Sequence, residues 1–333
     1  MALAMGSHAQ SYELFGSDEP LEVTIDMPLR PVIIKAADNP VVEGRIRFTD
    51  SDGAAVSIDM SMTTRGRSRL TYCKFPPLKM NLNRAQASGT LFDGQNKLKI
   101  VTHCRNGTLH LYYLQHEFEI YKAYNRLTDF SYRVRWAKIT YHDSEGRRRD
   151  QVHDAFFIES TAGLAARLGR ERIKENKIAS ARLDPVASSK YALFQFLIGN
   201  TDWSMTKGPA EEDCCHNGKV LGKPGSSLNL AVVPYDFDQA GLINTRYAMP
   251  AERLRLRSVR QRLYRGRCRH NGQLDATIVL FNARRKQLES HLASVKLPKR
   301  QQKTALKYID DFYKVVNNPK KKQRQLDEAC VGA

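Results

Sequence analysis

The sequence lacks most of the short patterns that assign a function directly. None of its six cysteines forms a Cys-x-x-Cys pair, which argues against a zinc ribbon. No apolar run approaches the ~18 residues that a membrane-spanning helix needs. Neither a glycine-rich GxGxxG sequence nor a Walker P-loop is present. A catalytic function must therefore rest on residues that are dispersed along the chain.

Negative charge is also scarce. The 333 residues include 53 Lys and Arg but 35 Asp and Glu, so the formal net charge is +18. Two stretches, Ala251–His270 and Lys296–Arg324, carry 15 of these 18 charges, and residues 1–250 are nearly balanced. Zinc-finger, helix-turn-helix and RNP motifs are absent, which argues against a nucleic-acid partner. The basic C-terminal third instead predicts an acidic protein substrate or another anionic surface.

The N-terminus and the cysteines bear on the cellular compartment. Leu3–Ala9 has the small-residue pattern of a signal-peptide cleavage region, without the charged start and apolar segment. It is either the end of a truncated secretory signal or a disordered N-terminus. If the protein is secreted or periplasmic, we expect disulfides between Cys73 and Cys104, and between Cys214 or Cys215 and Cys268. In a cytoplasmic protein the same residues would be buried thiols.

The first half of the chain is predicted to be β-rich. With 41% hydrophobic and 26% charged residues, the composition is that of a globular protein of about two domains or one bilobal unit. Apolar and polar residues alternate in several runs, and one helix is predicted at Leu109–Leu127. The predicted strands are Leu21–Ile25, Val41–Phe48, Val56–Met62, Pro77–Leu82, Tyr132–Tyr141 and Asp154–Glu159.

The second half is predicted to be mainly helical, with a loop at Gly208–Asn229 and a short strand at Leu228–Val233. The chain thus divides into a flexible N-terminus or signal-peptide remnant (1–20), a β-rich part (21–159), a helical part (160–316) and a basic tail (317–333). Several α+β layouts fit this order. The predicted helices are Leu164–Leu168, Ser188–Ile198, Pro250–Tyr264, Asp275–Val295 and Lys299–Val316.

Three polar segments carry the candidate chemistry. An apolar helix ends at Gly199, and Asn200 and Asp202 follow in a polar turn. Asn217 comes next, and a strand then leads into Asp236-Phe237-Asp238. Phosphoryl transfer needs a carboxylate at the attacking hydroxyl, and carboxylate and amide oxygens that hold Mg²⁺ on the nucleotide phosphates.

These residues resemble the spore-coat kinase family CotH and, more distantly, HipA-type and phosphoinositide kinases with a GxxD…N…DF pattern. Upstream, Arg65-Gly66 with Ser68, followed by Lys74–Lys79, is similar to the family's RG-S…KKPY-K segment. Phe156–Glu159 is similar to its hinge. The resemblance implies an α+β, bilobal protein-kinase-like fold, with a β-rich N-lobe containing one main helix and a mainly helical C-lobe.

The resemblance also implies a role for each residue. Asp202 would be the catalytic base, and Asn217 and Asp236 would bind Mg²⁺, or Mn²⁺ in its place. Asp238 would be a second ligand or would orient the first. Because the loop after Asp202 is long, Asn200 or Asn229 could replace Asn217. The nucleotide-binding residues would be Lys79 on the α/β-phosphates, Glu117 (or Glu119) paired with Lys79, Arg65 and Ser68 over the phosphates, and Glu159 in the hinge.

The implied function is an atypical kinase that transfers the γ-phosphoryl group of ATP to a protein hydroxyl. One alternative is a catalytically inactive pseudokinase or binding module, which docks an anionic partner through the basic C-terminus. In that case Asp202 would cap a turn, and Asp236 and Asp238 would be solvated carboxylates at a strand edge. A glycosyltransferase with Asp236-Phe237-Asp238 as its DxD motif ranks lower, because no alternating βαβ region precedes the motif.

Overall fold

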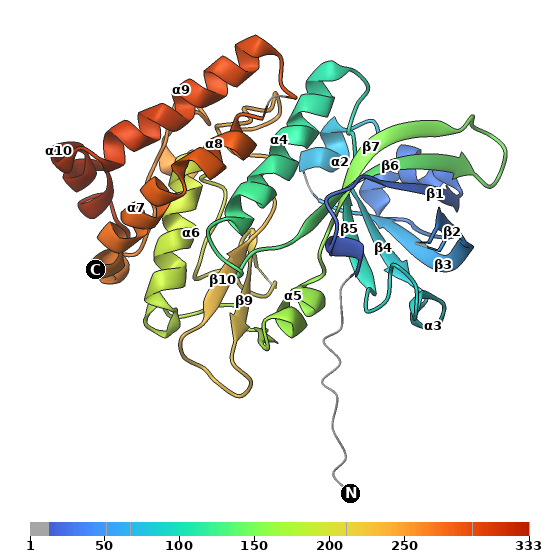
Figure 1. Ribbon diagram of the computed structural model, residues 1–333, viewed down its shortest axis with the longest axis horizontal. Helices are drawn as coiled ribbons and strands as arrows, with labels where there is room; N and C mark the ends of the chain where they lie inside the picture. The colour runs from blue at the N-terminus through green and yellow to red at the C-terminus, as the bar shows by residue number, and fades with distance from the viewer. Residues whose placement is uncertain (1–12, 51, 67, 211, 295, 333) are drawn as a thin grey trace, which may run out of the picture. The chain divides into compact units, whose positions relative to one another are not determined.

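The computed structural model describes residues 13–50, 52–66, 68–210, 212–294 and 296–332 (Figure 1). The chain divides into two compact units, each formed by two segments. The first unit contains the described residues up to Arg105 together with Val134–Gly163, and the second contains Asn106–Arg133 and the residues from Leu164 onward. The predicted signal-peptide remnant at Leu3–Ala9 lies outside the described residues.

The first unit is a closed seven-stranded barrel with strand order β1-β2-β3-β4-β5-β7-β6. Alternating burial explains how the sequence forms it: in β4 the residues Leu78, Met80 and Leu82 are buried, whereas Lys79 and Asn81 are exposed. Three short helices accompany the barrel: α1 (Leu29–Ile34), α2 (Ser68–Tyr72) and α3 (Arg84–Ala87). The strands are β1 (Leu21–Met27), β2 (Val41–Thr49), β3 (Ala55–Thr64), β4 (Leu78–Leu82), β5 (Lys97–Val101), β6 (Val134–Asp143) and β7 (Gln151–Ile158).

The predicted bilobal protein-kinase-like fold is wrong. The sheet closes into a mixed barrel because β1 pairs in parallel with β6 along its whole length, from Leu21 opposite Ala137 to Met27 opposite Asp143. The helix predicted as the main helix of the β-rich lobe, now α4 (Thr108–Asn125), belongs to the second unit. Periodicity along one strand does not reveal a partner more than a hundred residues away, so the closure escaped the sequence-based prediction.

The second unit combines a three-stranded sheet, in the order β10-β9-β8, with a set of helices. The helix α9 (Lys299–Val316) has its predicted bounds, and the predicted helix Asp275–Val295 is divided at Arg284 into two. The helix α5 (Thr161–Arg167) begins in the first unit and ends in the second. The other elements of the second unit are β8 (Glu171–Ile173), α6 (Pro185–Ile198), β9 (Gly218–Gly222), β10 (Ala231–Pro234), α7 (Leu274–Ala283), α8 (Arg285–Leu292) and α10 (Pro319–Lys322).

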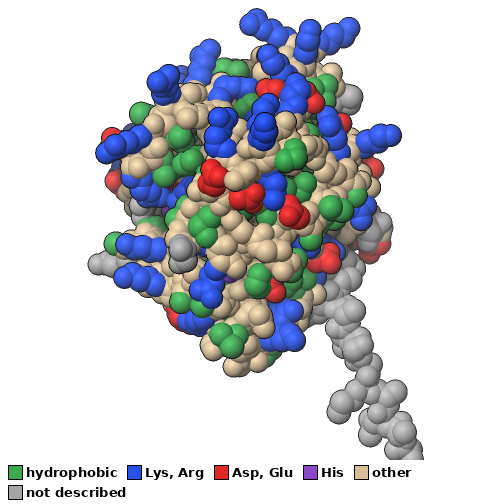
Figure 2. All heavy atoms as spheres, turned by 90° about the vertical axis from the view of Figure 1, so that its left-hand side faces the viewer, with side chains coloured by type: hydrophobic (Ala, Val, Ile, Leu, Met, Phe, Trp, Pro, Cys, Tyr) green, Lys and Arg blue, Asp and Glu red, His purple; other side chains and the backbone are tan. Residues whose placement is uncertain are grey.

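Two basic segments differ from their predictions. Pro250–Tyr264 does not form the predicted helix, and a short 3₁₀ turn at Glu252–Leu254 is its one described helical element. The residues after Asn317, predicted as a tail, form α10 and a further helical turn that ends at Asp327. Figure 2 shows Lys and Arg side chains gathered around the face that carries α9 and α10. The exposed lysines of these helices are Lys299, Lys303, Lys307, Lys314, Lys320 and Lys321.

All six cysteines are paired in disulfides. The predicted Cys73–Cys104 pair is confirmed. The predicted pairing of Cys214 or Cys215 with Cys268 is wrong, because Cys214 and Cys215 are bonded to each other and Cys268 is bonded to Cys330. The end of the chain lies beside Gly266, whose carbonyl oxygen accepts the Val331 N–H at 2.8 Å, and this places Cys330 near Cys268.

None of the helices in the described part of the chain is long and apolar enough to span a membrane.

We predict that Gly44→Ala destabilises the barrel. An alanine Cβ at this position in β2 would collide with the Asp26 carbonyl oxygen and lie 2.8 Å from the Met27 Cβ in β1. The expected loss is about 1–3 kcal/mol of unfolding free energy, the usual range for overpacking. Urea unfolding, followed by hydrogen exchange of the β1 and β2 amides, measures it. Gly272→Ala is the control, since no heavy atom lies within 4 Å of its added Cβ; equal effects of the two substitutions would contradict the prediction.

Candidate functional site

The first part of the candidate site is the turn that follows α6. The Asp184 side chain caps the start of this helix by accepting the Ala187 N–H, and Pro185 occupies its first turn. The helix ends at Gly199, which has a left-handed backbone (φ 66°) and would bring any Cβ against the Tyr308 hydroxyl. Glycine is therefore required here for both backbone conformation and space, and the chain turns sharply to present Asp202.

The second part is one end of the β9–β10 hairpin. Gly218 in β9 pairs with Pro234 in β10, and just beyond this pair the Tyr235 N–H donates to the Asn217 carbonyl oxygen at 3.1 Å. Asn217 immediately precedes β9, and Asp236 comes two residues after β10 ends. The register of the hairpin thus brings Asn217 and Asp236 to the same end of the sheet, although they are far apart in the sequence.

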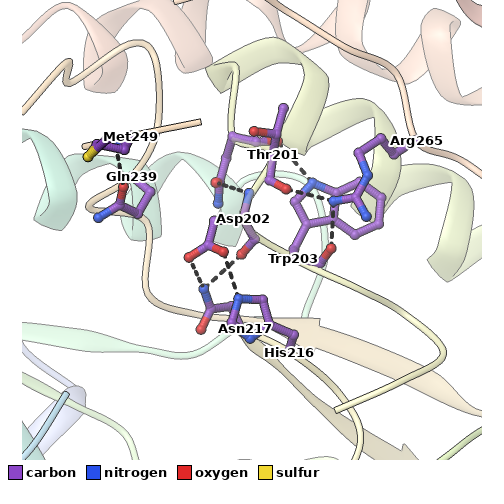
Figure 3. A network of polar contacts seen from close by, with 9 residues as sticks. Thr201, Asp202, Trp203, His216, Asn217, Gln239, Met249 and Arg265 are labelled. Carbon is purple, nitrogen blue, oxygen red and sulfur yellow. Dashed lines mark hydrogen bonds and ion pairs between the residues drawn. The ribbon is translucent and has the colours of Figure 1, made fainter. Parts of the chain in front are cut away.

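The Asp202 carboxylate joins these two parts (Figure 3). One oxygen lies 2.6 Å from the His216 Nε2, and the other accepts a hydrogen bond from the Asn217 side-chain amide at 3.0 Å. The same amide nitrogen also donates to the Asp202 main-chain carbonyl at 2.7 Å. In Figure 3 the Asn217 amide oxygen points away from Asp202. Asp202 is therefore held in one orientation from two directions, while the Asn217 oxygen faces elsewhere.

The turn itself is held by its own polar atoms and by one arginine. The Asn200 side chain accepts the Asp202 N–H at 3.0 Å, and the Trp203 indole donates to the Asn200 carbonyl at 2.9 Å. Arg265 donates to the carbonyl oxygens of Thr201 and Trp203, both at 2.6 Å, and stacks 4.9 Å from the Trp203 ring. Burial lowers the pKa of the Arg265 guanidinium to about 10, so it keeps its positive charge at neutral pH.

Aromatic packing fixes the segment that contains Asp236 and Asp238. Phe237 is fully buried, with its ring 4.7 Å from that of Tyr121 and 6.0 Å from that of Phe194. The Tyr121 hydroxyl, from α4, accepts the Asp236 N–H at 2.9 Å. Asp238 is buried, and its carbonyl oxygen accepts a hydrogen bond from the Thr245 hydroxyl at 3.2 Å. A buried ring thus sets the direction in which the two flanking carboxylates leave the backbone.

Of the predicted alternatives, Asn229 lies at the wrong end of the hairpin. It precedes Ala231, which pairs with Leu221, whereas Asn217 adjoins the opposite end. Asn200 is buried, and its side-chain oxygen already accepts the Asp202 N–H. Asn217 therefore remains the amide best placed beside Asp202.

The two glutamates predicted as alternatives on α4 have different surroundings. Glu117 is buried one turn before Tyr121, whereas Glu119 contacts the His291 Nδ1 at 2.7 Å. The Glu119 carboxylate is therefore paired with a residue of α8.

The remaining predicted site residues belong to the barrel unit. Lys79 is exposed in β4, opposite Thr63 of β3 and Lys99 of β5. Arg65 follows β3, and Ser68 is the first residue of α2. Glu159 is buried directly after β7. Their predicted nucleotide contacts stay predictions.

Sequence reasoning missed three residues that position the site: His216, Tyr121 and Arg265. His216 directly precedes Asn217, but its spacing to Asp202 follows no recognisable pattern. Arg265 lies within an arginine-rich run in which nothing distinguishes it from its neighbours. Tyr121 occurs in an apolar helical stripe, where an aromatic residue usually serves only the core.

The donor atoms near the hairpin end suit a metal that is completed by a substrate. Within the described residues there is no group of three His, Cys, Asp or Glu side chains arranged to hold a metal ion. Asp236, Asp238 and the Asn217 amide offer oxygen donors only. Oxygen is the donor type that Mg²⁺ prefers, and Mg²⁺ is commonly held by one or two carboxylates plus substrate phosphates.

No protein-family model matches the chain, and a search of curated proteins found no match. The resemblance to the CotH-like kinases therefore stays a prediction.

We predict that Arg265→Met destabilises the site turn. The substitution leaves the buried carbonyl oxygens of Thr201 and Trp203 without their donor, at an expected cost of about 2–4 kcal/mol of unfolding free energy. Hydrogen exchange of the amides at residues 199–203 should accelerate together with global unfolding. Arg257→Met is the matched control, because Arg257 is exposed on the same segment and its expected change is below about 0.5 kcal/mol. A turn that exchanges at the same rate in both variants would refute the role given to Arg265.

Proposed function

We propose that the second unit carries a phosphoryl-transfer site, which uses ATP and Mg²⁺, or Mn²⁺ in its place, to phosphorylate a hydroxyl group of a protein. One observation carries the proposal: the Asp202 carboxylate is oriented by His216 and Asn217 at the hairpin end that Asp236 also adjoins. A general base, together with amide and carboxylate oxygens that can hold a metal ion, is the set of protein groups that this reaction requires.

In this reaction Asp202 is the catalytic base. Its carboxylate orients the acceptor hydroxyl and takes its proton as the oxygen attacks the γ-phosphorus; the bond between that phosphorus and the bridging oxygen breaks, and ADP leaves. His216 and Asn217 are positioning residues, since each contacts one oxygen of Asp202. Because the carboxylate is already held in place, the free-energy cost of reaching the reactive geometry is lower.

Asp236 and Asp238, with the Asn217 amide oxygen, would hold the metal ion. The ion supplies neutralisation of the charge on the transferring phosphoryl group. Asn217 suits both roles, because its amide nitrogen binds Asp202 while its oxygen faces away (Figure 3). Arg65, Ser68, Lys79, Glu117 and Glu159 are proposed to bind the nucleotide on the strength of the resemblance.

The acceptor and the compartment are further parts of the proposal. Exposed lysines on α9 and α10 favour an acidic protein substrate, because opposite charge raises its local concentration. The three disulfides favour an oxidising compartment, so we propose that the protein is secreted or periplasmic.

We predict that Asp202→Asn and Asp236→Asn each abolish phosphoryl transfer. Both substitutions keep side-chain shape, but they remove the general base or the negative charge of a metal ligand, and loss of a general base typically lowers the rate by about 10²–10⁴-fold. The assay follows labelled γ-phosphate from ATP into an acidic protein, such as casein, with Mg²⁺ or Mn²⁺. Asp311→Asn is the control, because it removes one carboxylate from the surface of α9. Equal labelling by all four proteins would exclude Asp202 and Asp236 as catalytic residues.

A nucleotide-binding experiment separates this function from that of a binding module. A nucleotide present at 100 times its dissociation constant should raise the free energy of unfolding by about 2.7 kcal/mol. We expect Mg-ATP to stabilise the wild type, and Lys79→Met to reduce that stabilisation. If millimolar Mg-ATP shifts neither protein, the chain acts as a module that docks an anionic partner, and the transfer proposal fails.

A further inference from the structure

The second unit contains a cavity of about 390 Å³, and Asp202, His216 and Asn217 are not among the residues that line it. Its walls come from the N-terminal half of α4, the first turns of α9, the segment after Asp238, and Arg260. Figure 1 shows the first turns of α4 and α9 at the same upper end of this unit. The cavity volume falls within the usual range for small-molecule sites.

The cavity is strongly basic. Arg246, Arg260 and Arg300 line it, and among the residues that the structure describes no Asp or Glu belongs to its lining. Arg260 is held in place because it stacks 4.7 Å from the Tyr308 ring and donates to the Gly241 carbonyl. Arg246 and Arg300 form no ion pair with any described residue. Guanidinium groups that share a cavity without a carboxylate repel one another, and a bound anion removes that repulsion.

The start of α9 adds to the positive potential. Its first turn contains Lys299 and Arg300 but no acidic residue, and Pro298 at the N-cap has no side-chain acceptor for the free N–H groups. Helix N-termini carry a partial positive charge, which here lies next to the arginines and favours an anion.

Another part of the cavity wall is mainly aromatic and apolar. Tyr112, Tyr113 and His116 from α4 line it together with Leu242. Burial lowers the pKa of the His116 imidazole to about 4, so this ring is neutral at pH 7 and adds no charge to the wall. The His116 Nδ1 is buried, and no partner for it exists among the described residues. The wall therefore suits an organic group that carries a polar atom.

We propose that this cavity binds a small organic phosphate, with its phosphoryl group at Arg246, Arg260 and Arg300 and its organic part against Tyr112 and Tyr113. Arginine pairs with phosphate through parallel hydrogen bonds, and aromatic side chains supply a large apolar contact area. The proposal does not depend on phosphoryl transfer at Asp202. Because Leu242 donates to the Ile198 carbonyl at 2.9 Å, a bound ligand also stabilises a segment that is bonded to the end of α6.

Titration calorimetry of the full chain with phenyl phosphate tests the proposal. A chelator is present, so that no metal ion contributes to the measured binding. We expect binding that is tighter than that of inorganic phosphate and absent for phenol. Arg246→Gln and Arg300→Gln should each weaken binding about ten-fold, the loss expected for one charged hydrogen bond. Asp202→Asn should bind as the wild type does, which keeps this test separate from that of the proposed function.

Lys303→Gln is the matched control, since Lys303 is an exposed cation one turn after Arg300 and does not line the cavity. It should change the affinity by less than about two-fold. Equal weakening by Lys303→Gln and Arg300→Gln would show general surface attraction and overturn the proposal. So would inorganic phosphate that binds as tightly as phenyl phosphate, or no binding of phenyl phosphate at millimolar concentration.

Discussion

The Arg265 guanidinium makes the contact on which the candidate site depends. Through the carbonyl oxygens of Thr201 and Trp203 it fixes the turn that presents Asp202. Arg262 has a similar role at the end of α6, because its guanidinium donates hydrogen bonds to the carbonyl oxygens of Phe196 and Leu197. Carbonyl groups at the end of a helix lack partners within the helix, and buried carbonyls need donors. Two arginines supply those donors, so the turn does not depend on solvent for its hydrogen bonds.

These contacts give a structural role to part of the positive charge in the segment Ala251–His270. The arginine-rich segment does not form a helix, and its arginines divide into two groups. Arg260, Arg262, Arg265 and Arg267 are half-buried and bond to the surrounding chain, while Arg253, Arg255, Arg257 and Arg269 are exposed. Part of the charge that suggested an anionic partner therefore holds the protein together. The lysines of α9 and α10 remain exposed on the surface, and Arg246, Arg260 and Arg300 line the cavity beside α4.

The order of elements explains how distant residues form one site. A hairpin register is set by hydrogen bonding between strands, so Asn217 and Asp236 adjoin the same end of the hairpin because β9 and β10 pair from Gly218 and Pro234 onward. The buried Phe237 ring and the Tyr121 hydroxyl then fix the backbone between the two aspartates. The polar groups of the candidate site are thus supported by apolar packing and backbone hydrogen bonds.

Local patterns in the sequence predicted part of the local structure: the strands of the barrel other than β5, the bounds of α9, the turn at Gly199 and the polar residues that follow it. These features depend on neighbours in the sequence, and periodicity, glycine and capping residues report them directly. The three-dimensional structure was needed to show the closure of the barrel by β1 and β6, the pairing of Cys268 with Cys330, and the use of His216 and Arg265 at Asp202. Each of these depends on contacts between residues far apart in the chain, and local composition carries no signal for them. The arginine run shows the difference most clearly, because its charge was visible from the sequence while the acceptors of its hydrogen bonds came from elements up to 66 residues away.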